Sequence, residues 1–99
     1  MKDYKDINGK LPLQLIDPIW MEGLGKVLHY GIQKYGIENE GSWKHSDEQQ
    51  YIGALYRHML EHQKGNLIDP ESGLPHIEHA MFNIYAVAWH YYYGNTNKE

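Results

Sequence analysis

The sequence predicts an all-α fold, a small bundle of three main helices with room for a short fourth near its start. Apolar residues recur every three or four positions over long stretches, as they do on one face of a helix. Proline and glycine stand where these stretches begin and end, and there they favour helix termini. The last stretch, 75–93, is apolar almost all round, which is typical of a helix enclosed by other helices. A chain of 99 residues forms one domain.

The composition is that of an ordinary globular protein, with 41% hydrophobic and 22% charged residues. The absence of cysteine excludes disulfides, cysteine catalysis and cysteine zinc sites. The net charge of −4 argues against binding to a nucleic-acid polymer, because that binding needs a clustered basic face. No apolar run is long enough to span a membrane, and the start lacks the pattern of a signal peptide, so we expect a cytoplasmic protein. Nine tyrosines favour an interface or a ligand pocket.

The chain begins with a polar segment, and we expect residues 1–10 to form a mobile arm. Residues 11–16 alternate loosely between apolar and polar and contain a proline, so we expect an extended segment that lies across a groove. Asp17 and Pro18 are typical of a helix cap and a first helical residue, and Gly36 is typical of the glycine that follows a helix. The first helix is therefore predicted between these signals.

This first helix carries one apolar face and three glycines. Its predicted core residues share helical spacing: Trp20, Leu24, Val27, Leu28, Gly31 and Tyr35. Glycine weakens a helix by up to about 1 kcal/mol relative to alanine. Gly23, Gly25 and Gly31 therefore mark close helix contacts, or else tertiary packing tolerates them, and the sequence favours neither interpretation.

A polar loop, 36–47, follows and contains one tryptophan. Trp43 either folds back to cap the core, which is the more frequent case, or offers a flat surface on which a base or sugar stacks. Ser46 or Asp47 is predicted to cap a second helix that runs from Asp47 to about Lys64, and Gly65 to end it.

The last helix, predicted from about residue 75 to 93, is followed by a tail, 94–99, that we expect to fray. One polar line runs along this apolar helix: His76, His79, Asn83 and His90. A buried polar group without a partner costs about 1–3 kcal/mol, so the line predicts facing polar groups, ordered water, a metal or a ligand. Only two other long helices can cover this one, and we therefore expect a homodimer or a higher homo-oligomer to complete the bundle.

Histidines and acids at one end of the bundle are spaced as metal ligands can be. Pairs of histidines four apart on the second helix and three apart on the last helix let two imidazoles reach one ion. The candidate metal ligands are His58, His62, Asp69, Glu71, His76 and His79. The alternative is a polar seam in which these histidines bond to carboxylates and backbone. The sequence has no HExxH motif and no adjacent His-Asp pair.

The residues at the same end of the bundle also predict an anion site. The start of the last helix offers unpaired N–H groups and a positive dipole. Arg57 supplies a planar fork, Lys34 and Lys44 supply point charges, and Ser72 a hydroxyl. An ion pair with an acid of the turn at 69–71 is the alternative role for Arg57. A serine hydrolase is the weakest option, because the strand-turn-helix context of a nucleophile elbow is missing.

A set of short motifs, in order along the chain, resembles a phage-associated family. The motifs are GIQKYG at 31–36, Trp43, ALYRH at 54–58, Gly65, DPESG at 69–73 and HIEHAMFN at 76–83. Together they are similar to the N-terminal domain of dATP/dGTP diphosphohydrolases, which are related to MazG-type all-α nucleotide pyrophosphohydrolases. The resemblance covers about residues 11–89. It implies a helical, oligomeric, nucleotide-handling protein of viral or prophage origin, with 11–93 as a single nucleotide-binding domain in the host cytoplasm.

Residue chemistry and resemblance together give the candidate ligand-binding residues: Lys34, Tyr35, Trp43, Lys44, Arg57, His58, Ser72, His76, His79 and Asn83. The favoured hypothesis is binding of a purine nucleotide or a nucleotide-derived immune signal, so that the protein acts as a sponge that lowers the free concentration of its ligand. The first alternative is a metal-dependent (d)NTP diphosphohydrolase, with Mg²⁺ or Mn²⁺ held by Asp69, Glu71 and histidines. The second alternative is a protein interaction module. Binding without turnover is favoured because it needs no acidic metal cluster of the MazG type.

Overall fold

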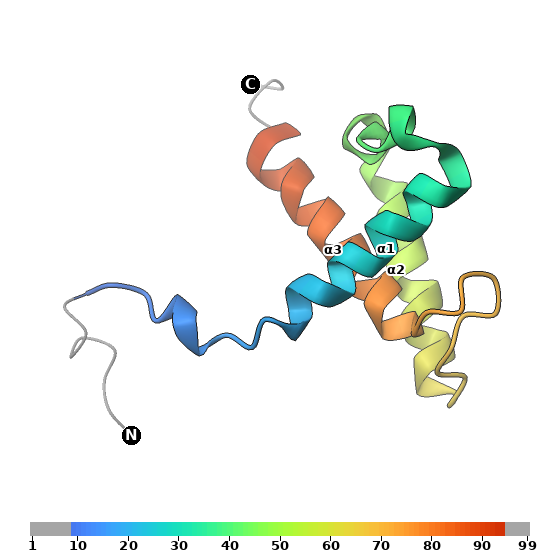
Figure 1. Cartoon of the computed structure of the whole chain (residues 1–99), viewed down its shortest axis with the longest axis horizontal. Helices are drawn as coiled ribbons and strands as arrows, with labels where there is room; N and C mark the ends of the chain where they lie inside the picture. Colours follow the sequence, from blue (N-terminus) through green and yellow to red (C-terminus); the bar gives the residue numbers. More distant parts are fainter. Residues whose placement is uncertain (1–8, 95–99) are drawn as a thin grey trace.

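Three α-helices form the body of the protein in the computed structural model, which describes residues 9–94 (Figure 1). They are α1 (Ile19–Tyr35), α2 (Glu48–Gln63) and α3 (His76–Trp89). Helices α2 and α3 run in opposite directions and pack most extensively against each other, and α1 packs on α3. The predicted all-α fold with three main helices is confirmed. Among the described residues no helix is both long and apolar enough to cross a membrane.

The ends of α1 and α2 lie within a residue or two of the predicted positions, because local chemistry determines them. Asp17 Oδ1 accepts a hydrogen bond of 3.0 Å from the Ile19 amide, and Asp47 Oδ1 accepts one of 3.0 Å from the Gln49 amide. Both helices are followed by a glycine with positive φ, Gly36 at 92° and Gly65 at 94°. These conformations favour glycine because it has no Cβ.

The loop between α1 and α2 contains two short 3₁₀ turns, η3 (Ile37–Asn39) and η4 (Ser42–His45). The second turn brings Trp43 back onto α3, where its ring centroid lies 5.6 Å from each of the rings of Phe82, Tyr85 and Trp89. The interpretation of Trp43 as a residue that caps the core is therefore confirmed. This contact holds the loop against the last helix.

The connection from α2 to α3 is a tight polar turn. Ile68 and Pro75 form an isolated antiparallel bridge, and the Asp69 amide donates to the Leu74 carbonyl at 2.8 Å. The turn places the end of α2 beside the start of α3, as the sequence predicts. After Trp89 the chain continues through a π-helical turn, η5 (His90–Gly94), so the predicted single helix to residue 93 changes its winding near its end.

The buried core is small and is made of small side chains. Val27 is 7% exposed, Ala80 2% and Ala86 0%. The predicted core face of α1 is wrong at its two ends, since Trp20 and Tyr35 are 56% and 60% exposed. The reason is that α1 meets α3 around its Gly23 and Val27 positions, so that the two ends of its apolar stripe extend beyond the contact.

The segment before α1 contains one 3₁₀ turn, η2 (Leu13–Leu15), and projects away from the helices (Figure 1). The expectation that residues 11–16 lie across a groove is wrong, because Leu13 and Leu15 are 65% and 73% exposed. Most of the expected mobile arm and frayed tail, residues 1–8 and 95–99, lie outside the described residues. The expected homo-oligomer stays a prediction.

We predict that close contact makes Gly23, but not Gly25, essential for packing. A Cβ at Gly23 would lie 2.7 Å from Met81 Cε and 3.3 Å from Glu78 Cγ, whereas one at Gly25 meets nothing within 4 Å. Gly23→Leu should therefore lower the free energy of unfolding by about 1–3 kcal/mol through overpacking. Gly25→Leu, the matched control, should leave that free energy unchanged or raise it by up to about 1 kcal/mol. Urea denaturation followed by circular dichroism measures both, and equal effects would contradict the prediction.

Candidate functional site

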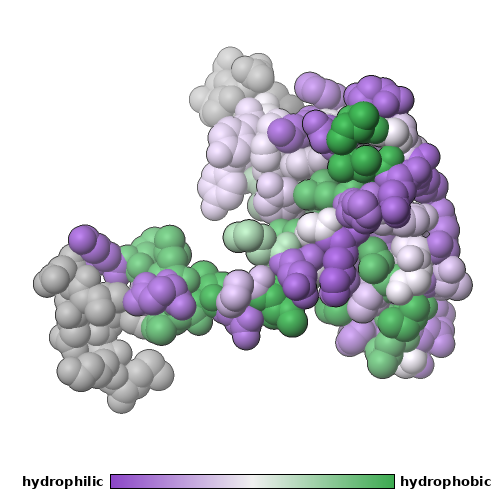
Figure 2. All heavy atoms as spheres, in the orientation of Figure 1, coloured by the Kyte–Doolittle hydropathy of each residue, from purple (hydrophilic) through white to green (hydrophobic). Residues whose placement is uncertain are grey.

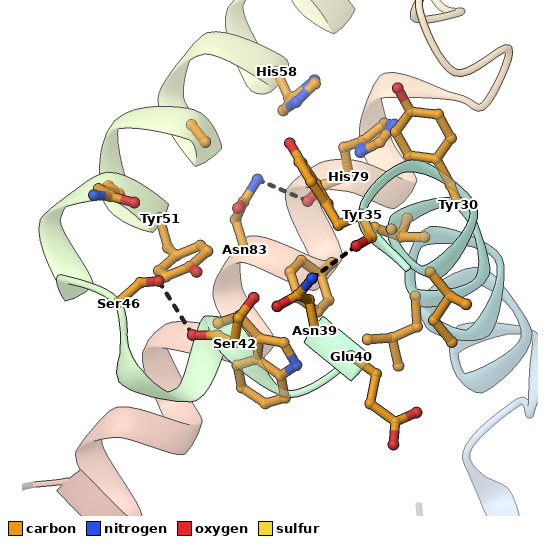
Figure 3. Close-up of a pocket in the computed structure, with 18 residues that line it drawn as sticks. Tyr30, Tyr35, Asn39, Glu40, Ser42, Ser46, Tyr51, His58, His79 and Asn83 are labelled. Atoms are coloured by element: carbon orange, nitrogen blue, oxygen red, sulfur yellow. Dashed lines mark hydrogen bonds between the residues drawn. The ribbon is translucent and has the colours of Figure 1, made fainter. Parts of the chain in front are cut away.

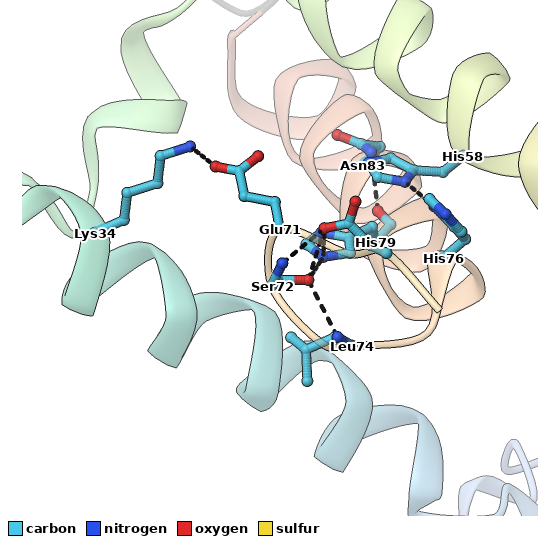
Figure 4. Close-up of polar contacts among 9 residues, drawn as sticks. Lys34, His58, Glu71, Ser72, Leu74, His76, His79 and Asn83 are labelled. Atoms are coloured by element: carbon cyan, nitrogen blue, oxygen red, sulfur yellow. Dashed lines mark hydrogen bonds and ion pairs between the residues drawn. The ribbon is translucent and has the colours of Figure 1, made fainter. Parts of the chain in front are cut away.

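Three imidazoles meet between the end of α2 and the start of α3 (Figure 4). The Nδ1 atoms of His58 and His76 lie 2.8 Å apart, and His58 stacks on His79 with ring centroids 4.6 Å apart and planes 10° apart. His76 is only 5% exposed. The first part of the polar line on α3 is therefore buried, and its partner is a histidine of α2. The last part is satisfied separately, since His90 Nε2 lies 3.1 Å from the carbonyl oxygen of Trp43.

Ser72 connects this histidine cluster to the turn before α3. Its Oγ lies 2.8 Å from Asp69 Oδ2 and 2.7 Å from His79 Nε2. The hydroxyl has one proton and the carboxylate needs a donor, so Ser72 donates to Asp69 and accepts from His79. His79 therefore does not act as a base toward Ser72. This arrangement does not favour a serine nucleophile.

The environment lowers the pKa of two of the histidines. Burial is the main cause at His58, and the neighbouring His79 and His76 act in the same direction. Burial also lowers the pKa of His79, against the opposing effect of Asp69. At Asp69 burial raises the pKa, but hydrogen bonds from the side chain and amide of Ser72 lower it overall. Near pH 7, neutral His58 and His79 therefore stand beside the ionised carboxylate of Asp69.

The six predicted metal ligands do not form a metal site within residues 9–94. No group of three or more histidines and acids there is arranged to hold an ion. Asp69 accepts from Ser72, and Glu71 is paired with Lys34. His62 lies one helical turn beyond His58 and has no partner in the cluster. The alternative, a hydrogen-bonded polar seam, is the arrangement that the described residues form.

A cavity of about 580 Å³ lies beside the histidine cluster, between α1, the loop after it, α2 and α3 (Figure 3). Aromatic side chains supply much of its lining: Tyr30, Tyr35, Trp43, Tyr51 and Phe82. Polar side chains supply the rest, among them Asn39, Glu40, Ser42, Ser46, Gln50 and Asn83. His58 and His79 line the end nearest the cluster. The volume falls in the range of about 300–1,000 Å³ that is typical of small-molecule sites.

Asn83 brings an incompletely satisfied polar group to this cavity. It is 5% exposed, and its Nδ2 donates to the carbonyl of His79 at 2.9 Å. No described residue donates a hydrogen bond to its Oδ1, and this atom is not fully buried. A buried carboxamide with a free acceptor at a cavity wall is a group that a ligand can satisfy.

The predicted ligand-binding residues divide into two groups. Those that line the cavity are Tyr35, Trp43, His58, His79 and Asn83. His76 is buried behind His58, and Ser72 belongs to the turn. The three predicted cations, Lys34, Lys44 and Arg57, are not among the residues that line the cavity. Lys44 covers the rings of Trp43 and Trp89 at 5.6 Å and 5.5 Å, and Arg57 is exposed and forms no ion pair among residues 9–94.

Lys34 lies at the rim of the cavity. It forms an ion pair with Glu71, and this pair lowers the pKa of Glu71 together with a hydrogen bond from Tyr30. Its Nζ is 5.2 Å from the ring centroid of Tyr35. The sequence interpretation missed Tyr30, Asn39, Glu40, Gln50 and Tyr51 as lining residues. The abundance of tyrosine was a signal for an aromatic pocket, but it did not indicate which tyrosines form it.

We predict that the protein loses stability between pH 7 and pH 5. The pKa values of His58 and His79 are lower in the folded chain than in the unfolded chain, where they are about 6.5. The unfolded chain therefore binds more protons as the pH falls below about 6.5, and the free energy of unfolding decreases by at most about 1.4 kcal/mol per pH unit for each proton. The negative charges of Asp69 and Glu71 act to raise the pKa of His79, but burial outweighs them. Both carboxyls stay ionised between pH 7 and pH 5, because their own pKa values are lowered.

Urea denaturation at a series of pH values measures this effect. His58→Gln should flatten the dependence, whereas His29→Gln, at an exposed position on α1, should leave it unchanged. A free energy of unfolding that is constant from pH 7 to pH 5 would contradict the prediction.

Comparison with known proteins assigns the chain to a family. Residues 2–98 match the model of the family described as dATP/dGTP diphosphohydrolase, N-terminal. The chain is also 39% identical, over 89 residues, to a dATP/dGTP diphosphohydrolase of Salmonella phage PMBT28. The alignment covers 90% of this chain and 30% of that protein, so the chain spans less than a third of its relative. No solved structure matches the chain. The chain belongs to the family of dATP/dGTP diphosphohydrolase N-terminal domains.

Proposed function

We propose that the cavity between the three helices binds a purine nucleotide. The observation that carries this proposal is its lining, in which five aromatic residues stand beside polar groups: Tyr30, Tyr35, Trp43, Tyr51 and Phe82. The description of the family and the name of the phage relative, which both refer to dATP and dGTP, support the choice of a purine. A purine offers the larger π-surface for such a wall, and stacking of a base on an aromatic side chain contributes about 1–3 kcal/mol.

The polar groups of the lining match the edge of a purine. Carboxamides such as those of Asn83 and Gln50 can both donate and accept, as recognition of adenine requires. The carboxylate of Glu40 accepts from the exocyclic amine of adenine or from the ring N–H and amine of guanine. We therefore assign the base to the part of the cavity that the loop after α1 and Asn83 enclose.

Phosphates fit best at the end of the cavity near His58 and His79. Their rings can donate N–H groups, and a bound anion would raise the pKa values that burial lowers. No lysine or arginine is among the cavity-lining residues of the described chain, but Lys34 stands at the rim beside Tyr35. Lys34 can bind a phosphate of the ligand if its ion pair with Glu71 breaks. Of the groups that the sequence suggests for the phosphate, this proposal keeps Lys34 and His58 and leaves out Arg57 and the start of α3.

Two outcomes of binding fit the proposed site. In the first, the domain holds an intact nucleotide and lowers its free concentration, as a sponge does. In the second, favoured by the family description and the relative's name, the domain contributes substrate recognition to dATP/dGTP diphosphohydrolysis. The described histidines and acids do not fit a preformed Mg²⁺ or Mn²⁺ site, so we derive no hydrolytic step from them.

The test is a thermal-shift screen with dATP, dGTP and dTTP, each with and without Mg²⁺ or Mn²⁺. A ligand at a hundred times its Kd stabilises the folded state by about 2.7 kcal/mol, which the Tm reports. Both purine nucleotides should raise the Tm more than dTTP. Heating the samples and separating the nucleotides by chromatography then shows whether this chain converts its ligand. Intact ligand supports binding without turnover, as a sponge or as a recognition domain, and monophosphate supports hydrolysis, whereas no rise in Tm with any nucleotide overturns the proposal.

At the residue level, we predict that Tyr35→Ala weakens binding by about five- to a hundredfold, because it removes one stacking surface worth about 1–3 kcal/mol. Tyr35 is 60% exposed in the free protein, so its removal should leave the fold intact. Tyr56→Ala is the matched control, since Tyr56 is 68% exposed and does not line the cavity. Isothermal titration of both variants with dATP measures the difference. Equal affinities would place the base elsewhere.

A further inference from the structure

The segment that leads into α1 exposes apolar side chains that nothing in the described chain covers. We call residues 11–21 the apolar arm. Six of its aliphatic and methionine side chains are 59–75% exposed: Leu11, Leu13, Leu15, Ile16, Ile19 and Met21. Figure 2 shows this arm as a largely apolar projection beside the more polar body of the molecule. Solvent exposure of so many neighbouring apolar groups is unfavourable in water.

A second exposed apolar surface lies on α3 and on the π-helical turn η5 that follows it. We call Ile77, Ile84, Tyr85 and Tyr92 the α3 outer face, and they are 37%, 56%, 42% and 66% exposed. Ile77 and Ile84 are seven residues apart and therefore lie on the same side of the helix. This face is the part of the apolar helix that α1 and α2 leave uncovered.

The arm cannot cover the α3 outer face of its own chain in this structure, because it points away from the helices (Figure 1). At the start of α1, Asp17 accepts from the Ile19 amide, a contact between near neighbours in the chain. The hydrogen bonds of η2 are local, from Leu15 to Pro12 and from Ile16 to Leu13. The two apolar surfaces are therefore separate in one chain.

We propose that the apolar arm of one copy packs on the α3 outer face of a second copy, and that the second copy does the same in return. Both surfaces belong to one chain, so a two-fold axis satisfies both at once. This inference does not depend on the proposed nucleotide site, since the arm lies outside the cavity lining.

The exposed area is sufficient for a stable dimer. A fully exposed aliphatic side chain presents roughly 100 Å² of apolar surface, and an aromatic one about 200 Å². Weighted by exposure, the six side chains of the arm present about 400 Å² and the α3 outer face about 300 Å². Two arms on two faces then bury at most about 1,400 Å², which lies within the range of about 1,200–2,000 Å² of stable protein interfaces.

Charge argues against a membrane as the occupant of the arm. Residues 11–21 contain one acid, Asp17, and no lysine or arginine. Helices that bind membrane surfaces are rich in lysine and arginine on their polar face. The whole chain has a formal charge of −4, which adds repulsion from an anionic bilayer.

The test combines single variants with a complementation experiment. Leu15→Glu should place a charge in the arm contact, and Ile84→Lys should place one in the face contact, so each variant alone should be monomeric where the wild-type chain is dimeric. Both positions are exposed, so the variants should fold. Mixing the two variants leaves one unaltered arm and one unaltered face in each mixed pair and should restore dimers. Light scattering after size-exclusion chromatography measures the mass, with Gln49→Glu and Gln33→Lys, at exposed positions outside both surfaces, as charge-matched controls.

Each result decides the proposal. Monomeric single variants, dimeric controls and a dimeric mixture support it. A wild-type chain that stays monomeric at about 100 μM, far above a Kd expected for such an interface, overturns it. Dimeric Leu15→Glu, or a mixture that stays monomeric, overturns the contact of arm with face. Binding of the monomer to phosphatidylglycerol vesicles would assign the arm to a membrane surface instead.

Discussion

The need to pair the polar groups of an otherwise apolar helix governs the arrangement of this domain. His76, His79 and Asn83 of α3 are buried or nearly so. Each must form hydrogen bonds, because an unpaired polar group in the interior costs about 1–3 kcal/mol. Asn83 donates within α3 to the carbonyl of His79, whereas the partners of His76 and His79 are His58 of α2 and Ser72 in the turn before α3. Since both belong to segments next to α3 in the chain, a short connection is enough to fix how α2 and α3 align.

The same alignment explains why there is a cavity. The histidine cluster joins α2 and α3 at one end, and Trp43 attaches the loop to α3 at the other by packing on Phe82, Tyr85 and Trp89. Helix α1 meets α3 around Gly23 and Val27 and again where Tyr30 contacts His79, and several tyrosines line the space between these contacts. The helices and the loop are joined at these contacts but not between them, so that a cavity with aromatic and hydrogen-bonding walls remains.

Much of the fold could be predicted from the sequence, because helix ends depend on local chemistry. Asp17, Asp47, Gly36 and Gly65 act within a few residues of their own positions, and each ends or caps a helix as predicted. The site was only partly predictable. Helical spacing puts His58 and His79 on inward faces, but the lining by Glu40 depends on how the loop folds back, which no local pattern encodes. The prediction that residues 11–16 lie across a groove was wrong for the same reason, because the position of this segment depends on tertiary contacts.

The small side chains of the core help to explain both the cavity and the exposed arm. Ala80 and Ala86 are the most deeply buried apolar residues, and they let the helices approach closely but contribute little apolar area. In a chain this short, a modest core leaves little stability to spare. The larger apolar side chains, such as Leu15 and Ile84, are instead at the surface. A ligand in the cavity or a second copy on α3 would therefore supply a substantial fraction of the apolar burial, which couples the stability of this domain to the partners it binds.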